Sequence, residues 1–346
     1  MSDAVAECSG ACPQDKRRRF NSFPHLRMTS QQYIQQELEK LKEFHSREVT
    51  KEKLADEIFR LLMSKKFRKY AASPQLIEQM KNAIKLNIEN NQPINVTFPH
   101  GAYKLWRLEE APLPDWAELF TAMYYTKWLK PICEIYKPGV WFDYFVDDLI
   151  VPILDNIPLK DVEDYIKDYQ KLLDFLKAYQ PQNFKMTITP FETLFSSRDA
   201  FQKSLQENIE KLSLTNPTFK EEDLTVVELN AKPTPEQLKD TNWREKIRLI
   251  HDAYIAMKRD LGYYFQPTKI PIFNQPLTSG RFLAVGVTKT SIAKFWVGIG
   301  ALKKLENNYI EYILSPKQIE LQKFTNEAIT FKELDSKNFK SIKIFS

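Results

Sequence analysis

The chain has 346 residues, of which 43% are hydrophobic and 13% aromatic, enough apolar material for a large buried core. Only 8 glycines occur, and none lies in a G-x-G-x-x-G or G-x-x-x-x-G-K pattern, which argues against a dinucleotide or P-loop nucleotide site. The net charge of +5 arises entirely within residues 1–70, which hold 15 Lys/Arg against 10 Asp/Glu. The neutral remainder lacks the basic field that nucleic-acid binding needs, so nucleic acid is disfavoured as a partner.

Residues 1–27 are polar and basic and show no apolar periodicity, which predicts a flexible basic leader. The leader contains Cys8 and Cys12, and with Cys133 the cysteine count is odd, so no disulfide framework is expected and a reducing cytoplasm fits. No second Cys/His pair follows Cys8 and Cys12 at ligand spacing, so no metal is predicted. The sequence has neither an apolar run of 18 residues nor the apolar core of a signal peptide, so no membrane association is expected.

Residues 28–90 are predicted to be helical. A capping box at Thr29–Gln32 begins an amphipathic segment, and a second one follows Thr50. A third helix is expected where Ser73 caps and Pro74 occupies the first helical position.

Residues 91–214 change to strands that alternate with helices. Strands are predicted at 94–98, 140–146 and 184–189, and helices at 115–136 and 158–178. Strands separated by helices of this length form a parallel sheet with crossover connections. The sequence therefore predicts a Rossmann-like α/β fold.

The remainder, residues 215–346, is expected to complete a single α/β domain that spans 28–346. Residues 215–240 are polar and proline-rich and are predicted to be a surface excursion. Residues 241–346 begin with a long helix to Leu261. The short links between the strands that follow favour antiparallel pairing, and those strands are expected at 269–273, 281–287, 294–299 and 309–314.

Ligands of open parallel sheets bind beyond the carboxyl ends of the strands. His100 and Lys104 follow the first predicted strand and are candidates for an anion or carbonyl site, while Asp147 follows the second and is a candidate acid, base or amine anchor. A loop histidine or lysine is also often solvated, and Asp147-Asp148 is also typical of a helix cap. No G-x-S-x-G or H-E-x-x-H motif is present, which argues against serine and zinc hydrolases.

Several features in the order found from Asn91 to Tyr165 resemble the isocyanide (isonitrile) synthase family, also described as pyoverdine/dityrosine biosynthesis proteins. The features are Asn91-Gln92-Pro93-Ile94 before a strand, Lys104 after it, Leu113-Pro114-Asp115 at a helix start, Tyr136-Lys137-Pro138-Gly139 before a strand ending at Asp147, and then Asp161-Val162 with Tyr165. The resemblance covers about residues 70–210, with a fainter echo from Lys269 to Gly298.

The resemblance implies an enzyme that joins the amine of an amino acid to a sugar phosphate of the ribulose 5-phosphate type, without a metal or other cofactor. By motif position Lys104 would matter most, as a phosphate or carbonyl partner, with Asp147 nearby. Together with His100, which follows the first predicted strand, these are the predicted catalytic residues. The residues predicted to bind substrate are Lys269 and Arg281, the basic side chains near the late positions, together with Asp148 and Trp296.

The chain also departs from the family pattern. The family has Ser-Asp-Gly at the second strand end and histidines in two late motifs, whereas this chain has Val146-Asp147-Asp148, Phe273-Asn274 and Phe295-Trp296. Two alternatives therefore stay open: a divergent, non-catalytic relative that binds a small metabolite or a protein partner, and a nucleic-acid-binding accessory protein that uses the basic leader. The sequence does not indicate an oligomeric state.

Overall fold

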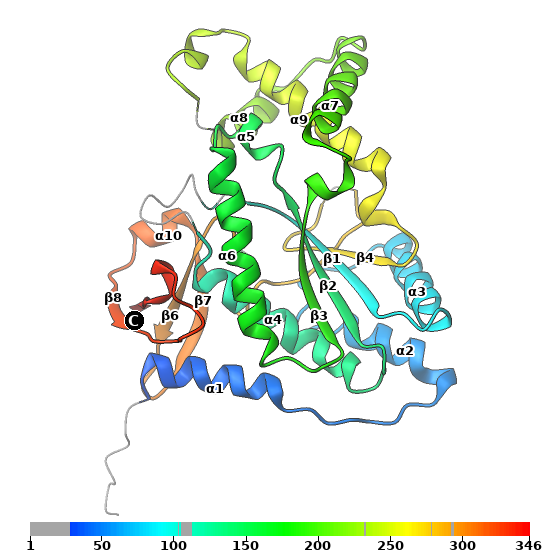
Figure 1. The fold of residues 1–346 in the computed structure, drawn as a ribbon, viewed down its shortest axis with the longest axis vertical. Helices are drawn as coiled ribbons and strands as arrows, with labels where there is room; N and C mark the ends of the chain where they lie inside the picture. The colour runs from blue at the N-terminus through cyan, green and yellow to red at the C-terminus, as the bar shows by residue number, and fades with distance from the viewer. Residues whose placement is uncertain (1–27, 103, 105–112, 232, 278, 292–293) are drawn as a thin grey trace, which may run out of the picture.

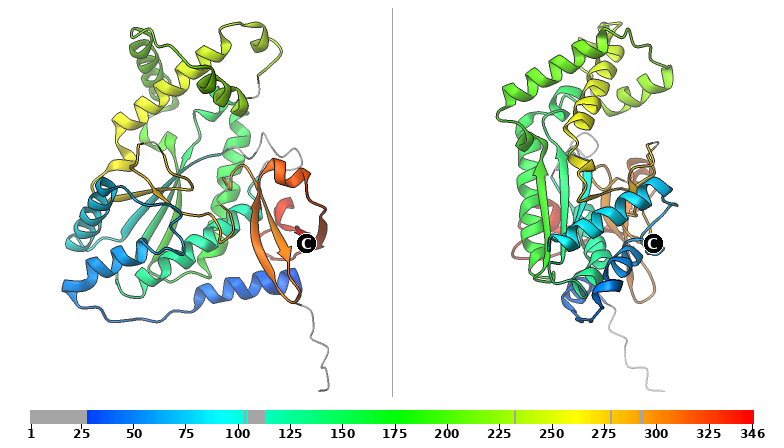
Figure 2. Two further views of the ribbon diagram at one scale, coloured as in Figure 1. Left: turned by 180° about the vertical axis from the view of Figure 1, so that it is seen from behind. Right: turned by 90° about the vertical axis from the view of Figure 1, so that its right-hand side faces the viewer.

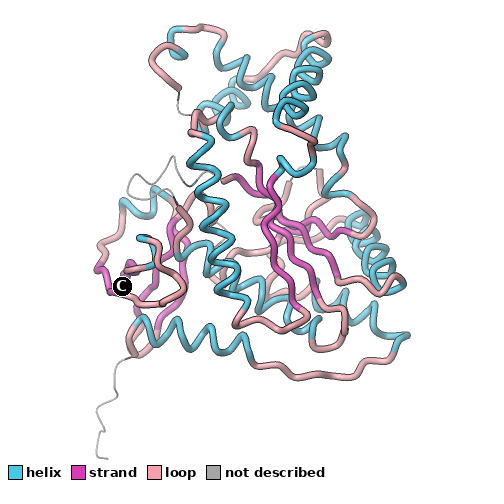
Figure 3. Tube along the Cα trace, in the orientation of Figure 1, coloured by secondary structure: helices cyan, strands magenta, loops and turns pink. Residues whose placement is uncertain are grey.

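The computed structural model describes residues 28–102, 104, 113–231, 233–277, 279–291 and 294–346 (Figure 1). The predicted leader, with Cys8 and Cys12, lies outside these residues. A parallel sheet occupies the middle of the molecule, a smaller second sheet lies beside it, and a group of helices projects beyond one edge (Figures 1 and 3).

The N-terminal part is helical, as the periodicity predicts, and consists of α1 (Ser30–Lys42), α2 (Lys51–Leu62) and α3 (Pro74–Glu89). Thr29 and Gln32 form the predicted capping box, and the Ser73 hydroxyl accepts a hydrogen bond from the Leu76 amide ahead of Pro74. Helix α3 packs against the first and fourth strands of the main sheet, and α2 packs against α3 and α4.

The main sheet has the strand order β3-β2-β1-β4-β5. Its first three strands are β1 (Ile94–Gly101), β2 (Val140–Asp147) and β3 (Phe184–Pro190), and both of their pairings are parallel. The crossover helices are α4 (Trp116–Cys133) and α6 (Leu159–Lys177), with the short α5 (Val151–Leu154) before α6. The predicted Rossmann-like α/β core is therefore confirmed.

The two faces of this sheet differ in chemistry because side chains alternate along each strand. One face carries Phe98, His100, Phe142 and Tyr144, and is covered by aromatic side chains of α4 and α6. The opposite face carries polar groups, including Thr97 and Asp143, which lie side by side in the β1–β2 register. Parallel strands are usually apolar on both faces. Buried polar groups on one face are therefore unusual and mark that face as a candidate for function.

The late strands divide between two sheets. Strands β4 (Lys269–Phe273) and β5 (Leu283–Ala284) extend the main sheet in parallel, so the expected antiparallel pairing is wrong for them. The reason is that the long helix α9 (Trp243–Leu261) carries the chain back and acts as a crossover to β4. The predicted strand at 294–299 begins only at Ile299, because Lys294–Gly298 forms a turn.

The second sheet has the order β7-β6-β9-β8, and its β6–β7 hairpin is antiparallel as predicted. It packs against α4 through β6 and β7, and Tyr309 contacts Tyr33 of α1. The elements of this part are β6 (Ile299–Lys304), β7 (Tyr309–Leu314), α10 (Pro316–Glu320), β8 (Thr325–Ala328) and β9 (Ser341–Phe345).

A helical arm, formed by α7 (Arg198–Ser213), α8 (Glu221–Asn230) and α9, extends past the carboxyl edge of the main sheet (Figures 1 and 2). Helix α9 packs against both other helices. The predicted surface excursion at 215–240 thus contains a helix that belongs to this arm. Among the residues that the structure describes, no helix is both long and apolar enough to cross a membrane.

Gly300 sets the distance between the second sheet and the start of α4. A Cβ at this position would lie 2.3 Å from the backbone carbon of Trp116 and 2.4 Å from the amide nitrogen of Ala117, at the start of α4. Glycine is needed here because the β6 backbone contacts the helix backbone directly.

Replacing Gly300 with alanine is expected to lower the free energy of unfolding by about 1–3 kcal/mol, because α4 must move away from β6. Urea denaturation measures this loss. Lys304→Ala, at the exposed end of the same strand, serves as the control and is expected to change stability by less than about 0.5 kcal/mol. Equal midpoints for the two variants would contradict the close approach.

Candidate functional site

The carboxyl edge of the main sheet separates the sequence-predicted residues into two groups. His100, Lys104 and Trp296 lie on the aromatic side of the sheet, whereas Asp147 points to the polar side, where α9 packs. Lys269 and Arg281 have contacts of their own and join neither group.

Lys104 lies in a buried ion-pair network. Its Nζ donates to Asp115 Oδ1 and Glu118 Oε2, each at 2.6 Å, and the Lys104 side chain is fully buried. Asp115 caps α4 and also accepts a hydrogen bond from the Gly300 amide at 3.3 Å. The Tyr165 hydroxyl donates to Glu118 Oε1 at 2.8 Å. One lysine therefore joins the loop after β1, two crossover helices and the second sheet.

Two carboxylates share this one ammonium. Burial raises the pKa of Glu118 to about 7, with the Asp115 charge acting in the same direction and Lys104 opposing it. Such a shift is expected where two acids and a single cation are removed from water. Lys104, Asp115 and Tyr165, which carry the family resemblance, thus lie in one network. Lys104 binds Asp115 directly and is linked to Tyr165 through Glu118, so these groups are already satisfied by protein partners.

His100 lies in an aromatic cluster next to this network. Its ring centroid is 5.2–6.5 Å from those of its neighbours, and its Nε2 has no hydrogen-bond partner among the described residues. Burial lowers the pKa of His100 to about 4, so the imidazole is neutral at pH 7. The surrounding rings are those of Phe98, Tyr144, Tyr165, Tyr169, Phe295 and Trp296. The Phe295-Trp296 pair occupies the late motif position and packs against His100.

An open cavity lies on the other side of the edge and is here called the Asp147 pocket. It has a volume of about 140 Å³, and α5, α8 and α9 form its walls. It is lined by Asp147, Ile150, Val151, Leu154, Asp155, Val227, Arg248, His251, Tyr254 and Ile255. Its place beyond the end of β2 is where an open parallel sheet binds its ligand.

Two carboxylates lie on one side of the Asp147 pocket. The Tyr254 hydroxyl and Lys258 Nζ both donate to Asp147 Oδ1 at 2.6 Å, and neither bonds to Oδ2. Asp155 is 7% exposed, and burial raises its pKa to about 7. These contacts hold the Asp147 carboxylate in a fixed orientation and leave one of its oxygens for a donor from a ligand.

Two cationic or titratable groups of α9 also line the pocket. Arg248 Nε donates to Asp252 Oδ2 at 3.0 Å, and Arg248 Nη1 approaches Asp223, but no hydrogen bond of Nη2 is found within the described residues. His251 Nδ1 lies 3.0 Å from Asp252 Oδ1. Asp252 therefore orients both side chains, and the arginine retains donors for an anion.

The other predicted residues have local partners. Asp148 Oδ1 accepts from the Glu192 amide at 3.2 Å, which ties the end of β2 to the turn after β3. The Arg281 guanidinium stacks over Phe265, 3.5 Å from the ring centroid. Lys269 Nζ lies over the Tyr263 ring, on the polar face. Their predicted roles in substrate binding stay predictions.

The sequence did not single out Glu118, Asp155, Arg248 or Lys258. Glu118 was visible only as the third position of a helix cap, and Asp155 lies in an unremarkable turn. Arg248, His251 and Lys258 lie in the long helix of the arm, where charges at helical spacing are typical of a solvated surface. Only the fold brings that helix to the end of β2.

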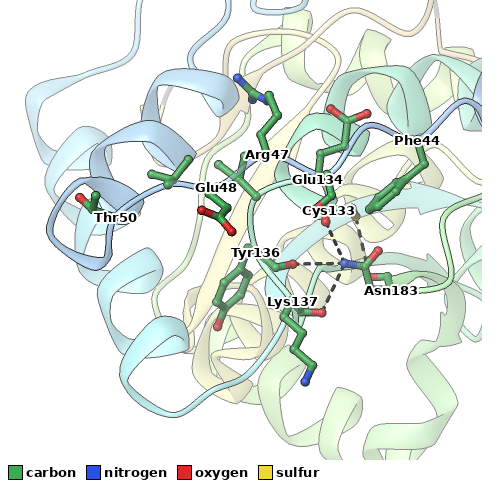
Figure 4. A pocket seen from close by; sticks show the side chains of 12 residues that line it. Phe44, Arg47, Glu48, Thr50, Cys133, Glu134, Tyr136, Lys137 and Asn183 are labelled. Atoms are coloured by element: carbon green, nitrogen blue, oxygen red, sulfur yellow. Dashed lines mark hydrogen bonds between the residues drawn. The ribbon is translucent and has the colours of Figure 1, made fainter.

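A second hollow lies at the opposite, amino-terminal edge, between the segment at 44–50 and the start of β2 (Figure 4). Its volume is about 840 Å³, but its polar groups fasten the fold. Asn183 Nδ2 donates to the backbone carbonyls of Cys133, Tyr136 and Lys137 at 2.9–3.3 Å. Burial raises the pKa of the Cys133 thiol to about 12, so that thiol is not a nucleophile near pH 7. Within the described residues no group of three or more His, Cys, Asp or Glu is arranged to hold a metal ion.

The architecture belongs to the α/β class in which a parallel five-stranded sheet, flanked by helices, is combined with a second mixed sheet. The same fold occurs in the crystal structure of the PvcA protein from Pseudomonas aeruginosa, with a TM-score of 0.59 and 13% sequence identity. The match covers 85% of this chain and 100% of that one. Comparison of the sequence with protein-family models and with curated proteins gives no match.

Lys104→Met is expected to lower the free energy of unfolding by about 3–5 kcal/mol, because two buried carboxylates lose the lysine that binds them both. Adding Glu118→Gln to Lys104→Met should recover part of the loss. The control Lys85→Met, at an exposed lysine 3.8 Å from Glu89, should cost less than about 1 kcal/mol. A Lys104→Met protein as stable as the control would show that the network does not support the fold.

The burial of His100 in its neutral form is expected to make the stability of the protein depend on pH. Its folded pKa of about 4 is below the ordinary value of 6.5, so its contribution is complete above pH 6.5 and is lost as the pH falls towards 4. Between about pH 7 and about pH 4.5 the wild type should lose roughly 2 kcal/mol more than His100→Phe. Urea titrations at both pH values measure the difference, and parallel losses would contradict a buried neutral imidazole.

Proposed function

We propose that this protein is a divergent enzyme of the isocyanide-synthase type that binds an amino acid in the Asp147 pocket and joins its amine to a sugar phosphate. The fold shared with PvcA agrees with the family resemblance in the sequence, and the reaction is the one that the resemblance implies. The observation that carries the proposal is that the carboxylates of Asp147 and Asp155 and the guanidinium of Arg248 line the same pocket.

An α-amino acid is complementary to this arrangement. Its ammonium group matches Asp147 Oδ2 and Asp155, and its carboxylate matches Arg248 Nη2. The apolar walls of α5, with Ile150 next to them, suit a hydrophobic side chain. A pocket of about 140 Å³ is smaller than the roughly 300–1,000 Å³ of typical ligand sites, which restricts it to a small metabolite and excludes a dinucleotide.

The pocket also holds groups for proton transfer. A bound amine must lose a proton before it attacks a carbonyl carbon. Asp155, with a pKa of about 7, is a base suited to that step near neutral pH. Asp147, held by Tyr254 and Lys258, would fix the amine while the proton moves. These roles replace the late histidines of the family pattern.

The non-catalytic alternative is favoured by a different observation. His100, Lys104 and Trp296 are buried in contacts with other side chains, so the aromatic side of the edge is filled. A relative that had lost the reaction would be expected to close its crevice in this way. Under this alternative the Asp147 pocket binds its ligand but no reaction follows.

Aromatic amino acids are expected to raise the melting temperature of the wild type, and a ligand at a hundred times its dissociation constant adds about 2.7 kcal/mol. Arg248→Met should abolish this stabilisation. Arg244→Met, one turn earlier on α9 and paired with Glu221 and Glu228 outside the pocket, should retain it. Equal stabilisation of both variants would exclude the pocket.

The reaction is tested by mass spectrometry of mixtures of the protein, an aromatic amino acid and ribulose 5-phosphate. A product that contains the amino-acid nitrogen and one added carbon supports the enzyme. Binding without product supports the non-catalytic relative. The absence of both overturns the proposal.

A further inference from the structure

A second polar cluster lies on the polar face of the main sheet, away from the Asp147 pocket. It consists of Lys269 on β4, Asp143 on β2, and Tyr263 of the short turn η4 (Tyr263–Phe265), and is here called the Lys269 cluster. Asp143 is fully buried and Lys269 is 4% exposed. Phe145 stacks on Tyr263 with the ring centroids 4.1 Å apart, and separates Asp143 from Asp147 along β2.

Asp143 is held as a fixed carboxylate. Its Oδ1 accepts from Thr187 Oγ1 at 2.9 Å and from Thr189 Oγ1 at 2.6 Å, and its Oδ2 accepts from the Tyr263 hydroxyl at 2.6 Å. Three hydroxyl donors satisfy the carboxylate without a direct contact to the nearby lysine. Asp143 thus orients the Tyr263 hydroxyl.

Lys269 differs from the other buried lysines of the chain. Lys104 and Lys258 each have a carboxylate oxygen at 2.6 Å, whereas within the described residues no carboxylate lies within 4 Å of Lys269 Nζ and no hydrogen bond of that atom is found. Its contact is the Tyr263 ring, whose centroid is 3.0 Å away. Burial lowers the pKa of Lys269 to about 8, although the Asp143 charge opposes the shift.

We propose that Lys269 is a nucleophilic amine that binds a small aldehyde or ketone as a Schiff base on the polar face of the sheet. The neutral amine forms the C–N bond, and the carbonyl oxygen then leaves as water with the two amine protons, so the step needs no oxidant or reductant. The Tyr263 hydroxyl, which donates to Asp143 in the free protein, turns to the departing oxygen, gives it a proton and regains one from the nitrogen, so the water carries away only the two amine protons. The half-buried Tyr263 ring also covers the amine, so the ring must move when the carbonyl compound enters.

This inference stands apart from the Asp147 pocket and holds whether or not that pocket binds an amino acid. Its test is reductive trapping of the full-length protein with glyoxylate and cyanoborohydride near pH 7, followed by peptide mapping. At that pH a lysine of pKa 8 has on the order of 100-fold more free amine than an ordinary lysine. Lys269 should therefore be labelled at least tenfold faster than the exposed Lys185, which lies over Trp141 on the same face.

The matched controls separate chemistry from folding. Lys185→Met should leave labelling of Lys269 unchanged, and Tyr263→Phe, which keeps the ring, should slow it several-fold. Because Lys269→Met changes a buried position and can therefore destabilise the fold, the peptide map of the wild type is the deciding measurement. Labelling confined to exposed lysines, with Lys269 untouched, would overturn the proposal and would leave the amino-acid titration of the Arg248 variant unaffected.

Discussion

The fold depends on how one buried positive charge is neutralised. Lys104 is removed from water between Asp115 and Glu118, and this arrangement is favourable only if Asp115 caps α4 and the first turn of α4 faces the loop after β1. The Asp115 carboxylate also accepts a hydrogen bond from the Gly300 amide, which holds the second sheet against the start of α4. The position of the aromatic cluster between α6 and the main sheet follows from this anchor, because Tyr165 binds Glu118 from the α6 side.

Protein side chains fill the aromatic side of the carboxyl edge, so ligand binding is expected on the polar side. The polar face of the sheet and the cavity beyond β2 together hold the Asp147 carboxylate, the Arg248 guanidinium and the Lys269 amine, which has no carboxylate partner within the described residues. Buried charges without complete pairing cost folding free energy, and they are expected where binding or catalysis requires them. The two proposals use different members of this set, so each stands or fails separately.

Much of the architecture could be predicted from local patterns. The caps at Thr29, Ser73 and Asp115 predict where three helices begin. The β-branched runs, separated by helices, predict the first three strands and their parallel pairing. The pairing of β4 could not be predicted from link lengths, because the helix that precedes it returns the chain to the edge of β1. The candidate site could be only partly predicted from the sequence for the same reason. Asp147 is predicted by its place at a strand end, whereas Arg248 belongs to a helix that tertiary packing brings to the pocket. The burial of Lys104 requires the Glu118 carboxylate, and the sequence pattern identifies Glu118 only as part of a helix cap.

A crystal structure of the protein with a bound aromatic amino acid tests the function of the Asp147 pocket most directly. We expect electron density for the ligand in the Asp147 pocket, with its amine beside Asp147 Oδ2, its carboxylate on Arg248, and Lys104 still paired with Asp115 and Glu118. Density for the ligand on the aromatic side, with His100 and Trp296 displaced and Lys104 released towards the ligand, would contradict it.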